Sequence, residues 1–291
     1  SDNKAINIRN FEIKSTDSYF NMRASIDWNA FDSKSPGKAA LRLMADIGKP
    51  DMIRLMGGAD EKFIQKYPSM PLKIVAGVDG NMNSLNITTF HAMLPQAFDI
   101  VMEGKIDNVA DNSDRDGKVT LNAKSDNIEF LAPLAGGMII PSGTSLDGTF
   151  LLKGTSVNAD FILKQFNSKI VNDSIQQNDS IFSIPKVEEE LPKLKGFDVN
   201  NALRMLAFFD WDKKSYEVDL SSIEFDLHKF FPADSMSIFT ANAYAKGEGF
   251  DIFSKNTLLS AKASIKRFDY GSYDLAGFVF DASLVDNKVK A

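Results

Sequence analysis

Apolar and polar side chains alternate one by one over long stretches of this chain. In 38–46 every second residue is apolar, and 118–125 repeats the pattern. The apolar positions of these two stretches are Ala39, Leu41, Leu43, Ala45, Val119, Leu121 and Ala123. A period of two residues is typical of a half-buried β-strand, because successive side chains point to opposite sides of the sheet. The same alternation predicts strands over 20–28 and 98–106.

Polar connections separate these predicted strands. The segments 31–37 and 111–117 are rich in residues that tolerate tight turns and positive φ angles, so each strand pair is predicted to form a hairpin. After the hairpins the alternation is lost over 50–56 and 127–134, and both segments lead into a pair of glycines. This pattern predicts a short helix in each segment, and a further one is predicted over 60–66. We expect these helices to plug an end of the sheet or to cover part of it.

Two segments of the chain, about 7–58 and 86–137, are copies of each other. The matched residues include Ile8/Ile87, Phe20/Phe98, Ile26/Ile106, Leu41/Leu121, Asp46/Asp126 and Gly57/Gly136. The offset is 79 at the first pair, 78 at the phenylalanines, 80 over the next three pairs and 79 at the glycines, and we expect these changes to fall in turns. A shift of two residues keeps every side chain on its face. The repeat therefore favours an extended β-surface over a single catalytic pocket.

The chain divides into three predicted parts. We assign 1–170 to a β-repeat region, 171–196 to a polar loop or linker, and 197–291 to a third, diverged β-repeat region. The middle part contains Pro185, Pro192 and three consecutive glutamates, which a central strand does not accommodate.

In the last part, strands are predicted over 235–247, 257–268 and 273–283, whereas 203–211 fits either a strand or an apolar helix. The whole pattern predicts a mainly β protein: an elongated, curved antiparallel sheet, groove-like or taco-like, built from repeats with a few short helices. Its apolar face must either pack on a second layer, as in a sandwich, or stay open for a ligand. Six residues are candidates for lining such a groove, although each could equally be ordinary core: Leu41, Leu43, Phe98, Ile100, Val119 and Leu121.

Composition and charge narrow the function classes. A hydrophobic content of 44% excludes wholesale disorder, and 23 phenylalanines against 2 tryptophans and 6 tyrosines supply much apolar area with few polar groups. The net charge of −6 provides no basic face for nucleic acid, so we expect no nucleic-acid partner. The absence of cysteine excludes disulfides, thiolate nucleophiles and cysteine-ligated zinc.

Candidate chemistry is sparse along the chain. His91 and His228 are the only histidines, and no nucleophile-elbow, phosphate-loop or zinc-protease motif occurs. The loop 112–117 matches the first positions of a calcium loop, but Ala123 stands where a bidentate glutamate is required, which favours a plain acidic turn. We therefore predict no catalytic residues, no metal site, no cofactor and no enzymatic activity.

Further short patterns join the phased repeat. Turns of related sequence occur in 48–55, 126–131 and 225–231, and Leu/Val-Asp-Gly sequences are expected to open strands at 78–80 and 146–148. With these features the chain resembles the AsmA/TamB-type envelope proteins over most of its length outside the predicted linker. The resemblance implies a periplasmic protein anchored in the inner membrane, with a β-groove that shields lipid acyl chains in transit to the outer membrane.

The resemblance also implies the partners. They would be a phospholipid or another acyl lipid, with membrane contact through parts of a longer parent chain, because the membrane anchor of such proteins is missing here. The alternative is a scaffold or chaperone that pairs its exposed strand edges with outer-membrane proteins during their assembly. Physical reasoning supports shielding, because a fourteen-carbon chain gains on the order of 11 kcal/mol from burial, at about 0.8 kcal/mol for each CH₂ group.

Overall fold

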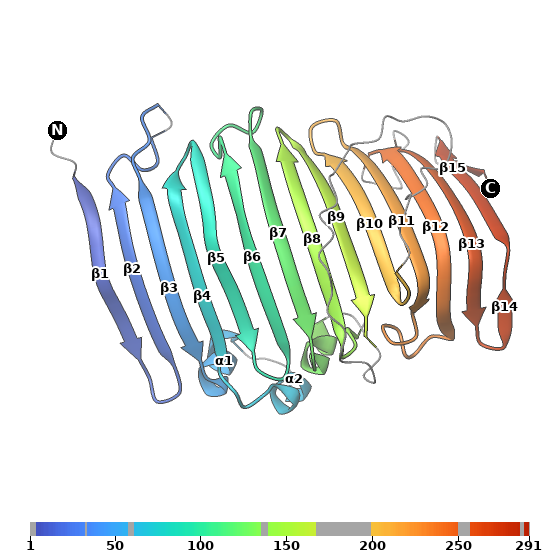
Figure 1. Cartoon of the computed structure of the whole chain (residues 1–291), viewed down its shortest axis with the longest axis horizontal. Helices are drawn as coiled ribbons and strands as arrows, with labels where there is room; N and C mark the ends of the chain where they lie inside the picture. The colour runs from blue at the N-terminus through green and yellow to red at the C-terminus, as the bar shows by residue number, and fades with distance from the viewer. Residues whose placement is uncertain are drawn as a thin grey trace.

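The computed structural model describes residues 4–32, 34–57, 61–134, 139–166, 199–249, 257–285 and 288–290. Within these residues the chain forms one elongated antiparallel sheet, with short helices near one end of the strands (Figure 1). The predicted fold class, mainly β with an extended antiparallel sheet, is confirmed. The predicted linker 171–196 lies outside the described residues, and the three-part division of the chain stays a prediction.

The elements have the following bounds. The strands are β1 (Ala5–Lys14), β2 (Tyr19–Asp27), β3 (Ala39–Ile47), β4 (Leu72–Asn81), β5 (Ser84–Leu94), β6 (Phe98–Asp107), β7 (Asp116–Ser125), β8 (Thr144–Lys153), β9 (Ser156–Gln165), β10 (Ala202–Asp210), β11 (Ser215–Asp226), β12 (Met236–Glu248), β13 (Leu258–Tyr270), β14 (Tyr273–Leu275), β15 (Phe278–Val285) and β16 (Lys288–Lys290). The helical segments are α1 (Lys49–Leu55), α2 (Glu61–Lys66) and the 3-10 helix η1 (Glu129–Leu134).

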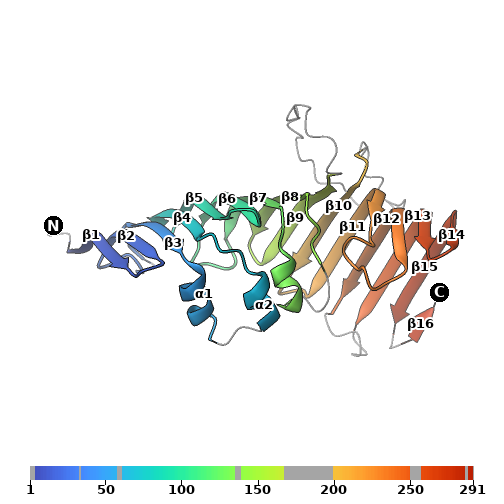
Figure 2. The ribbon, with the colours of Figure 1, turned by 90° about the horizontal axis from the view of Figure 1, so that it is seen from below.

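The sheet is a simple meander. Each strand pairs with its sequence neighbours from β1 to β13, then with β15 and β16, while β14 pairs with β13. Strands β9 and β10 pair directly over their full lengths, so the sheet continues across the segment 167–198. Figure 2 shows the twist of the sheet along its length, as expected for L-amino acids, and shows α1 and α2 on one side of it.

The repeat appears as units of four strands, β1–β4, β5–β8 and β9–β12. In each unit the connection between the third and fourth strands contains an excursion, by which we mean a segment that leaves the sheet. The excursion is α1 with α2 in the first unit, η1 in the second and the turn 227–231 in the third. The pairing register of β1 with β2 shifts between Ile8 and Phe11, and that of β5 with β6 shifts between Ile87 and Phe90. Both copies therefore carry a β-bulge at the same place, 79 residues apart, and the bulge is part of the repeated design.

One detail of the predicted alignment is wrong. Phe20 lies opposite Ile13 of β1, and the residue opposite the corresponding Ala92 of β5 is Ile100. Phe20 therefore matches Ile100 with an offset of 80. Phe98 pairs with Leu94 at the very start of β6, one step beyond the last strand pair of the first copy, Lys14 with Tyr19. The offset changes once here, in the turn after the first strand of each unit, because that turn differs in length by one residue between the copies.

Other local predictions have mixed outcomes. The ambiguous segment 203–211 lies mainly in strand β10, and 273–283 contains two strands, β14 and part of β15, instead of one. The sequence 146–148 lies near the start of β8 as expected, but 78–80 lies at the end of β4. The expected strand opening is therefore wrong for the first copy, because the alternation of β4 begins already at Leu72.

The strands have two distinct ends. The capped end carries α1, α2, η1 and the turn 227–231, and the free end carries the hairpin loops on the opposite side (Figure 1). At the capped end, side chains from helices and strands form what we call the end cluster: Phe63, Tyr67, Leu94, Ala97, Ile128 and Phe130. Its aromatic rings pack at centroid distances of 5.1–5.6 Å. The short helices thus serve as a local plug, which is one of the two roles that the sequence predicted.

Candidate functional site

The pairing register collects the apolar residues on one side of the sheet, which we call the apolar face. A single row of laterally paired residues shows its continuity: Phe11, Met22, Leu43, Ala76, Phe90, Met102, Leu121, Gly148, Phe161, Met205, Leu220, Ala243, Ala263 and Phe280. No polar side chain interrupts this row. Strands lie about 4.8 Å apart, so the row runs for roughly 60 Å.

The structure brings all six predicted lining residues to this face. Leu43 and Leu121 belong to the row above, and Leu41 and Val119 belong to the next row toward the free end. Ile100 lies one row toward the capped end. Phe98 lies at the capped end itself, where it packs against the end cluster. Five of the six therefore face the open part of the sheet, and Phe98 supports the plug.

Little of the apolar face is covered by the described residues. Outside the end cluster, the buried apolar residues are alanines and two phenylalanines at the capped end, Phe225 and Phe230. Larger side chains remain accessible, with exposed fractions of 37% at Leu41, 45% at Phe11 and 40% at Phe280. A sandwich would bury such residues under a second sheet. Among the described residues the face is open, and the two-layer alternative finds no support there.

The opposite side, which we call the polar face, is held together by charged and polar side chains. Arg204 of β10 forms a two-point ion pair with Asp160 of β9, at 2.8 and 3.0 Å, and both side chains are about four-fifths buried. Lys164 pairs with Asp147 at 3.2 Å, again between neighbouring strands. These cross-strand contacts fix the register of the sheet, and hence the alignment of the apolar rows on the other side.

Burial and neighbouring charges on this face also shift the pKa values of two side chains. Burial, together with the nearby charge of Glu217, raises the pKa of Asp219 to about 6, although Arg204 acts in the opposite direction. Tyr244 donates a hydrogen bond to Glu217 at 3.0 Å, and burial raises the pKa of its phenol to about 12. Because Asp219 keeps a raised pKa despite a nearby arginine, it is a local cost to stability at neutral pH.

A hollow of about 430 Å³ lies over β6–β9, mainly on the polar face. Its lining includes the carboxylates of Glu103, Asp147 and Asp160. Two of these already have cationic partners, Lys164 for Asp147 and Arg204 for Asp160. We therefore assign this hollow a structural role in the polar face.

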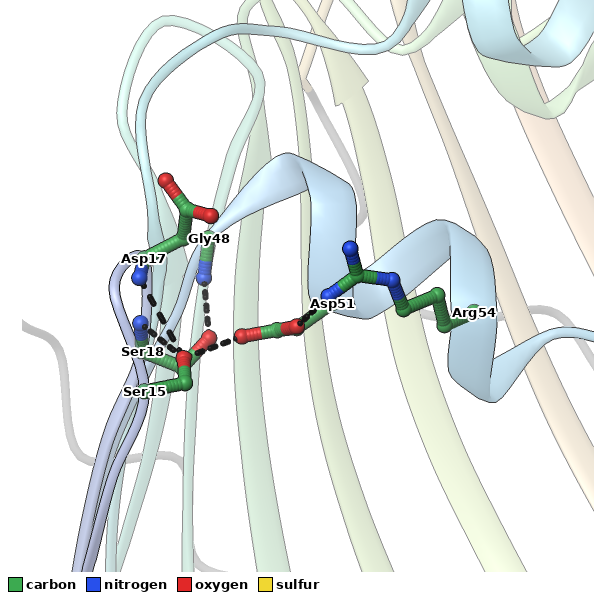
Figure 3. A network of polar contacts seen from close by, with 6 residues as sticks. All are labelled: Ser15, Asp17, Ser18, Gly48, Asp51 and Arg54. Carbon is green, nitrogen blue, oxygen red and sulfur yellow. Dashed lines mark hydrogen bonds and ion pairs between the residues drawn. The ribbon is translucent and has the colours of Figure 1, made fainter.

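A polar network fixes α1 at the capped end, against the turn between β1 and β2 (Figure 3). The Ser15 hydroxyl donates a hydrogen bond to Asp51, and Arg54 pairs with the other oxygen of that carboxylate at 2.8 Å. The backbone N–H of Gly48 donates to the Ser18 hydroxyl at 3.0 Å. The hydrogen bond from Ser15, followed by contributions from Ser18 and Arg54, lowers the pKa of Asp51. Hydrogen bonds and an ion pair within the first unit thus hold α1 in place.

The remaining chemical candidates lie apart from one another. His91 contacts Asp99 at 2.7 Å on the polar face, whereas His228 contacts the backbone oxygen of Asp234 at the capped end. In the loop 112–117, Arg115 contacts the side chain of Asn112. The described part of the chain contains no group of three or more acidic or histidine side chains placed to hold a metal ion. None of its helices is long and apolar enough to cross a bilayer.

Comparisons with protein-family models, curated proteins and solved structures find no match for this chain. The family resemblance, the periplasmic location and the lipid partner therefore stay predictions. The structure itself shows an open, unbroken apolar face, a polar face joined by cross-strand ion pairs, and a plug at one end of the strands.

Proposed function

We propose that this chain is a non-enzymatic shield for the acyl chains of a phospholipid or another acyl lipid, which lie along the apolar face. The observation that carries the proposal is the row of apolar side chains across fourteen strands, which is exposed at its two ends and partly exposed on most of the strands between them. An exposed apolar surface of this extent is a liability in water unless something covers it. An acyl chain is an apolar ligand of matching, extended shape.

The uniform chemistry of the face suits movement of a ligand. Each CH₂ group gains about 0.8 kcal/mol from leaving water, and the apolar row offers similar side chains at every strand. A chain that slides by one strand exchanges one set of contacts for an equivalent set, so it meets no deep trap. We propose that the protein does this in the periplasm, as a segment of an AsmA/TamB-like envelope protein carrying lipid between the inner and outer membranes.

Native mass spectrometry of protein purified without detergent tests the binding step. We expect copurified acyl lipid, together with saturable binding of a fluorescent fatty acid below its micelle concentration. Recovery of lipid-free protein that also fails to bind the fatty acid would contradict the proposal. Fractionation of the source cells with an antibody tests the location, and a cytosolic pool alone would exclude the envelope part of the proposal.

A second candidate function rests on the edge of the sheet. Within the described residues β1 pairs with β2 alone, so its other edge offers unpaired backbone groups to an added strand. We propose strand addition from an outer-membrane protein as the alternative role. A photo-crosslinker at Arg9 of β1 would capture such a client, while the same crosslinker at Thr120 in central β7 would not. Equal capture at both positions would exclude edge pairing.

A further inference from the structure

Both tryptophans of the chain occupy the same place in their repeat units. Trp28 follows β2 and Trp211 follows β10, the second strands of the first and third units. Each comes directly after an aspartate that ends the strand, Asp27 or Asp210. Both positions are at the free end of the strands, away from the helices (Figure 1).

The tryptophans continue the apolar face beyond the sheet. Ile26 and Phe209 are the last residues of their strands on that face, and each tryptophan follows two positions later. The backbone N–H of Trp28 donates to Lys4 and that of Trp211 to Thr155, which continues the strand pairing by one residue and keeps each tryptophan on the apolar side. The ring of Trp211 contacts that of Phe209, with centroids 6.0 Å apart. The free end of the apolar face is therefore extended by two large aromatic side chains.

The loops that carry the tryptophans expose their large residues. In the loop 28–38, Ala30 is only 2% exposed, whereas Trp28 is 67% and Phe31 78% exposed. Trp211 is 57% exposed. Soluble loops ordinarily show small or polar side chains to water, so this inversion points to a partner with an apolar interior.

Hydrogen bonds hold the backbone near both tryptophans. Asp27 accepts a hydrogen bond from the backbone N–H of Lys38, and the Asn29 amide donates to a backbone oxygen within the loop at 2.7 Å. Asp210 accepts from the backbone N–H groups of Asp212 and Lys213. Both tryptophans thus lie beside backbone that is anchored by hydrogen bonds.

Charge distinguishes these loops from their counterpart in the second unit. The loops 28–38 and 211–214 each contain two lysines and one aspartate, in a chain of net charge −6. The matching loop 108–115 has no tryptophan and contains two aspartates and one arginine. Tryptophan beside lysine is the combination found where proteins meet the headgroup region of a bilayer.

We propose that the free end of the sheet rests on the surface of a phospholipid bilayer, with Trp28, Phe31 and Trp211 in the headgroup region. The two tryptophans are eight strands apart, or roughly 40 Å, so they support the sheet at two points. The apolar face then meets the membrane along its uncapped end. On the proposed shielding function, an acyl chain passes from bilayer to sheet without crossing water, although membrane contact does not itself depend on that function.

Tryptophan fluorescence tests this contact on the intact chain, because the chain contains only these two tryptophans. The probe is a vesicle of phosphatidylcholine and phosphatidylglycerol with brominated acyl chains, which quench nearby tryptophan. We expect quenched, blue-shifted emission from protein that sediments with the vesicles. Replacing either tryptophan by serine should weaken vesicle binding roughly tenfold, which is about 1.4 kcal/mol for each.

Controls separate this proposal from shielding. Tyr273 is 70% exposed at the capped end, so Tyr273→Ser should leave vesicle binding unchanged. The Trp28→Ser/Trp211→Ser variant should still bind a monomeric fluorescent fatty acid, because neither tryptophan is one of the six lining residues. Trp28→Phe and Trp211→Phe, which keep an aromatic ring and the fold, should bind vesicles more tightly than the serine variants.

Several results would overturn the proposal. The first is tryptophan emission that does not change when vesicles are added, and the second is quenching found only in protein that stays in the supernatant with an extracted lipid. The third is full vesicle binding by the double serine variant, and the fourth is a loss of vesicle binding with Tyr273→Ser equal to that with the tryptophan variants. Loss of fatty-acid binding with intact vesicle binding would instead reject the shielding function and leave membrane contact standing.

Discussion

Replacing Leu121 by aspartate places a carboxylate in the middle of the apolar face. Leu121 is partly exposed, with Met102 and Gly148 beside it on the neighbouring strands. Truncation of a fully buried leucine costs roughly 2–5 kcal/mol, so we expect Leu121→Asp to lower the free energy of unfolding by only about 1–2 kcal/mol. The new carboxylate keeps its water because nothing in the described structure covers that part of the face.

The effect on a ligand should be larger. An acyl chain crossing this position would lose the favourable burial of two or three CH₂ groups, about 2 kcal/mol, which corresponds to a roughly thirtyfold weaker affinity. Urea unfolding followed by circular dichroism measures the stability, and titration with a fluorescent fatty acid measures the affinity. Lys118→Asp is the matched control, because it adds an aspartate to the polar face of the same strand and should leave the affinity unchanged.

Two results would refute this reasoning. If Leu121→Asp unfolds the protein, the carboxylate is buried without a partner, and the face is covered after all. If Leu121→Asp folds and binds the fatty acid as tightly as the unchanged chain, or if Lys118→Asp weakens binding equally, acyl chains do not lie on the apolar face.

Three further predictions concern stability. Asp219 binds its proton more tightly in the folded than in the unfolded chain, so its contribution to stability is full below pH 4 and is lost as the pH rises through about 6. Asp219→Asn should therefore stabilise the protein by about 1 kcal/mol at pH 7.5, a figure that allows for partial solvation of the carboxylate. At pH 3.5 the same substitution should not stabilise the protein. An equal gain at both pH values would contradict this origin. The buried hydroxyl of Tyr67 has no hydrogen-bond partner among the described residues, so Tyr67→Phe should leave the urea midpoint unchanged or raise it, and a clear decrease would reveal a partner. Ser15→Ala should raise the pKa of Asp51, measured by NMR, and speed amide exchange in α1 but not in β7, whereas an unchanged pKa would exclude the Ser15 hydrogen bond as its main cause.

The sequence predicted the strands and their faces well, because a half-buried strand records its orientation in alternate residues. Leu41, Leu43, Val119 and Leu121 were assigned to one surface from period two alone, and the pairing register confirms it. The repeat also predicted where the excursions fall in the first two units, since the loss of alternation after residue 48 recurs after residue 126.

Other features depended on information that alternation does not carry. The alignment of Phe20 with Phe98 instead of Ile100 failed because an alignment displaced by two residues leaves the facing pattern intact. The ion pair between Arg204 and Asp160 joins residues separated by a long segment, and only the pairing of β9 with β10 brings them together. The shared place of the tryptophans became visible once the four-strand unit was known.

Site-resolved photolabelling tests the central claim most directly. The protein is mixed with a fatty acid that carries a diazirine on its chain, irradiated and digested, and the labelled residues are identified by mass spectrometry. We expect label on alternate residues of β3 and β7, at Leu41, Leu43, Val119 and Leu121, with little at the intervening positions. Label on both faces alike, or none on these strands, would contradict an acyl-binding apolar face.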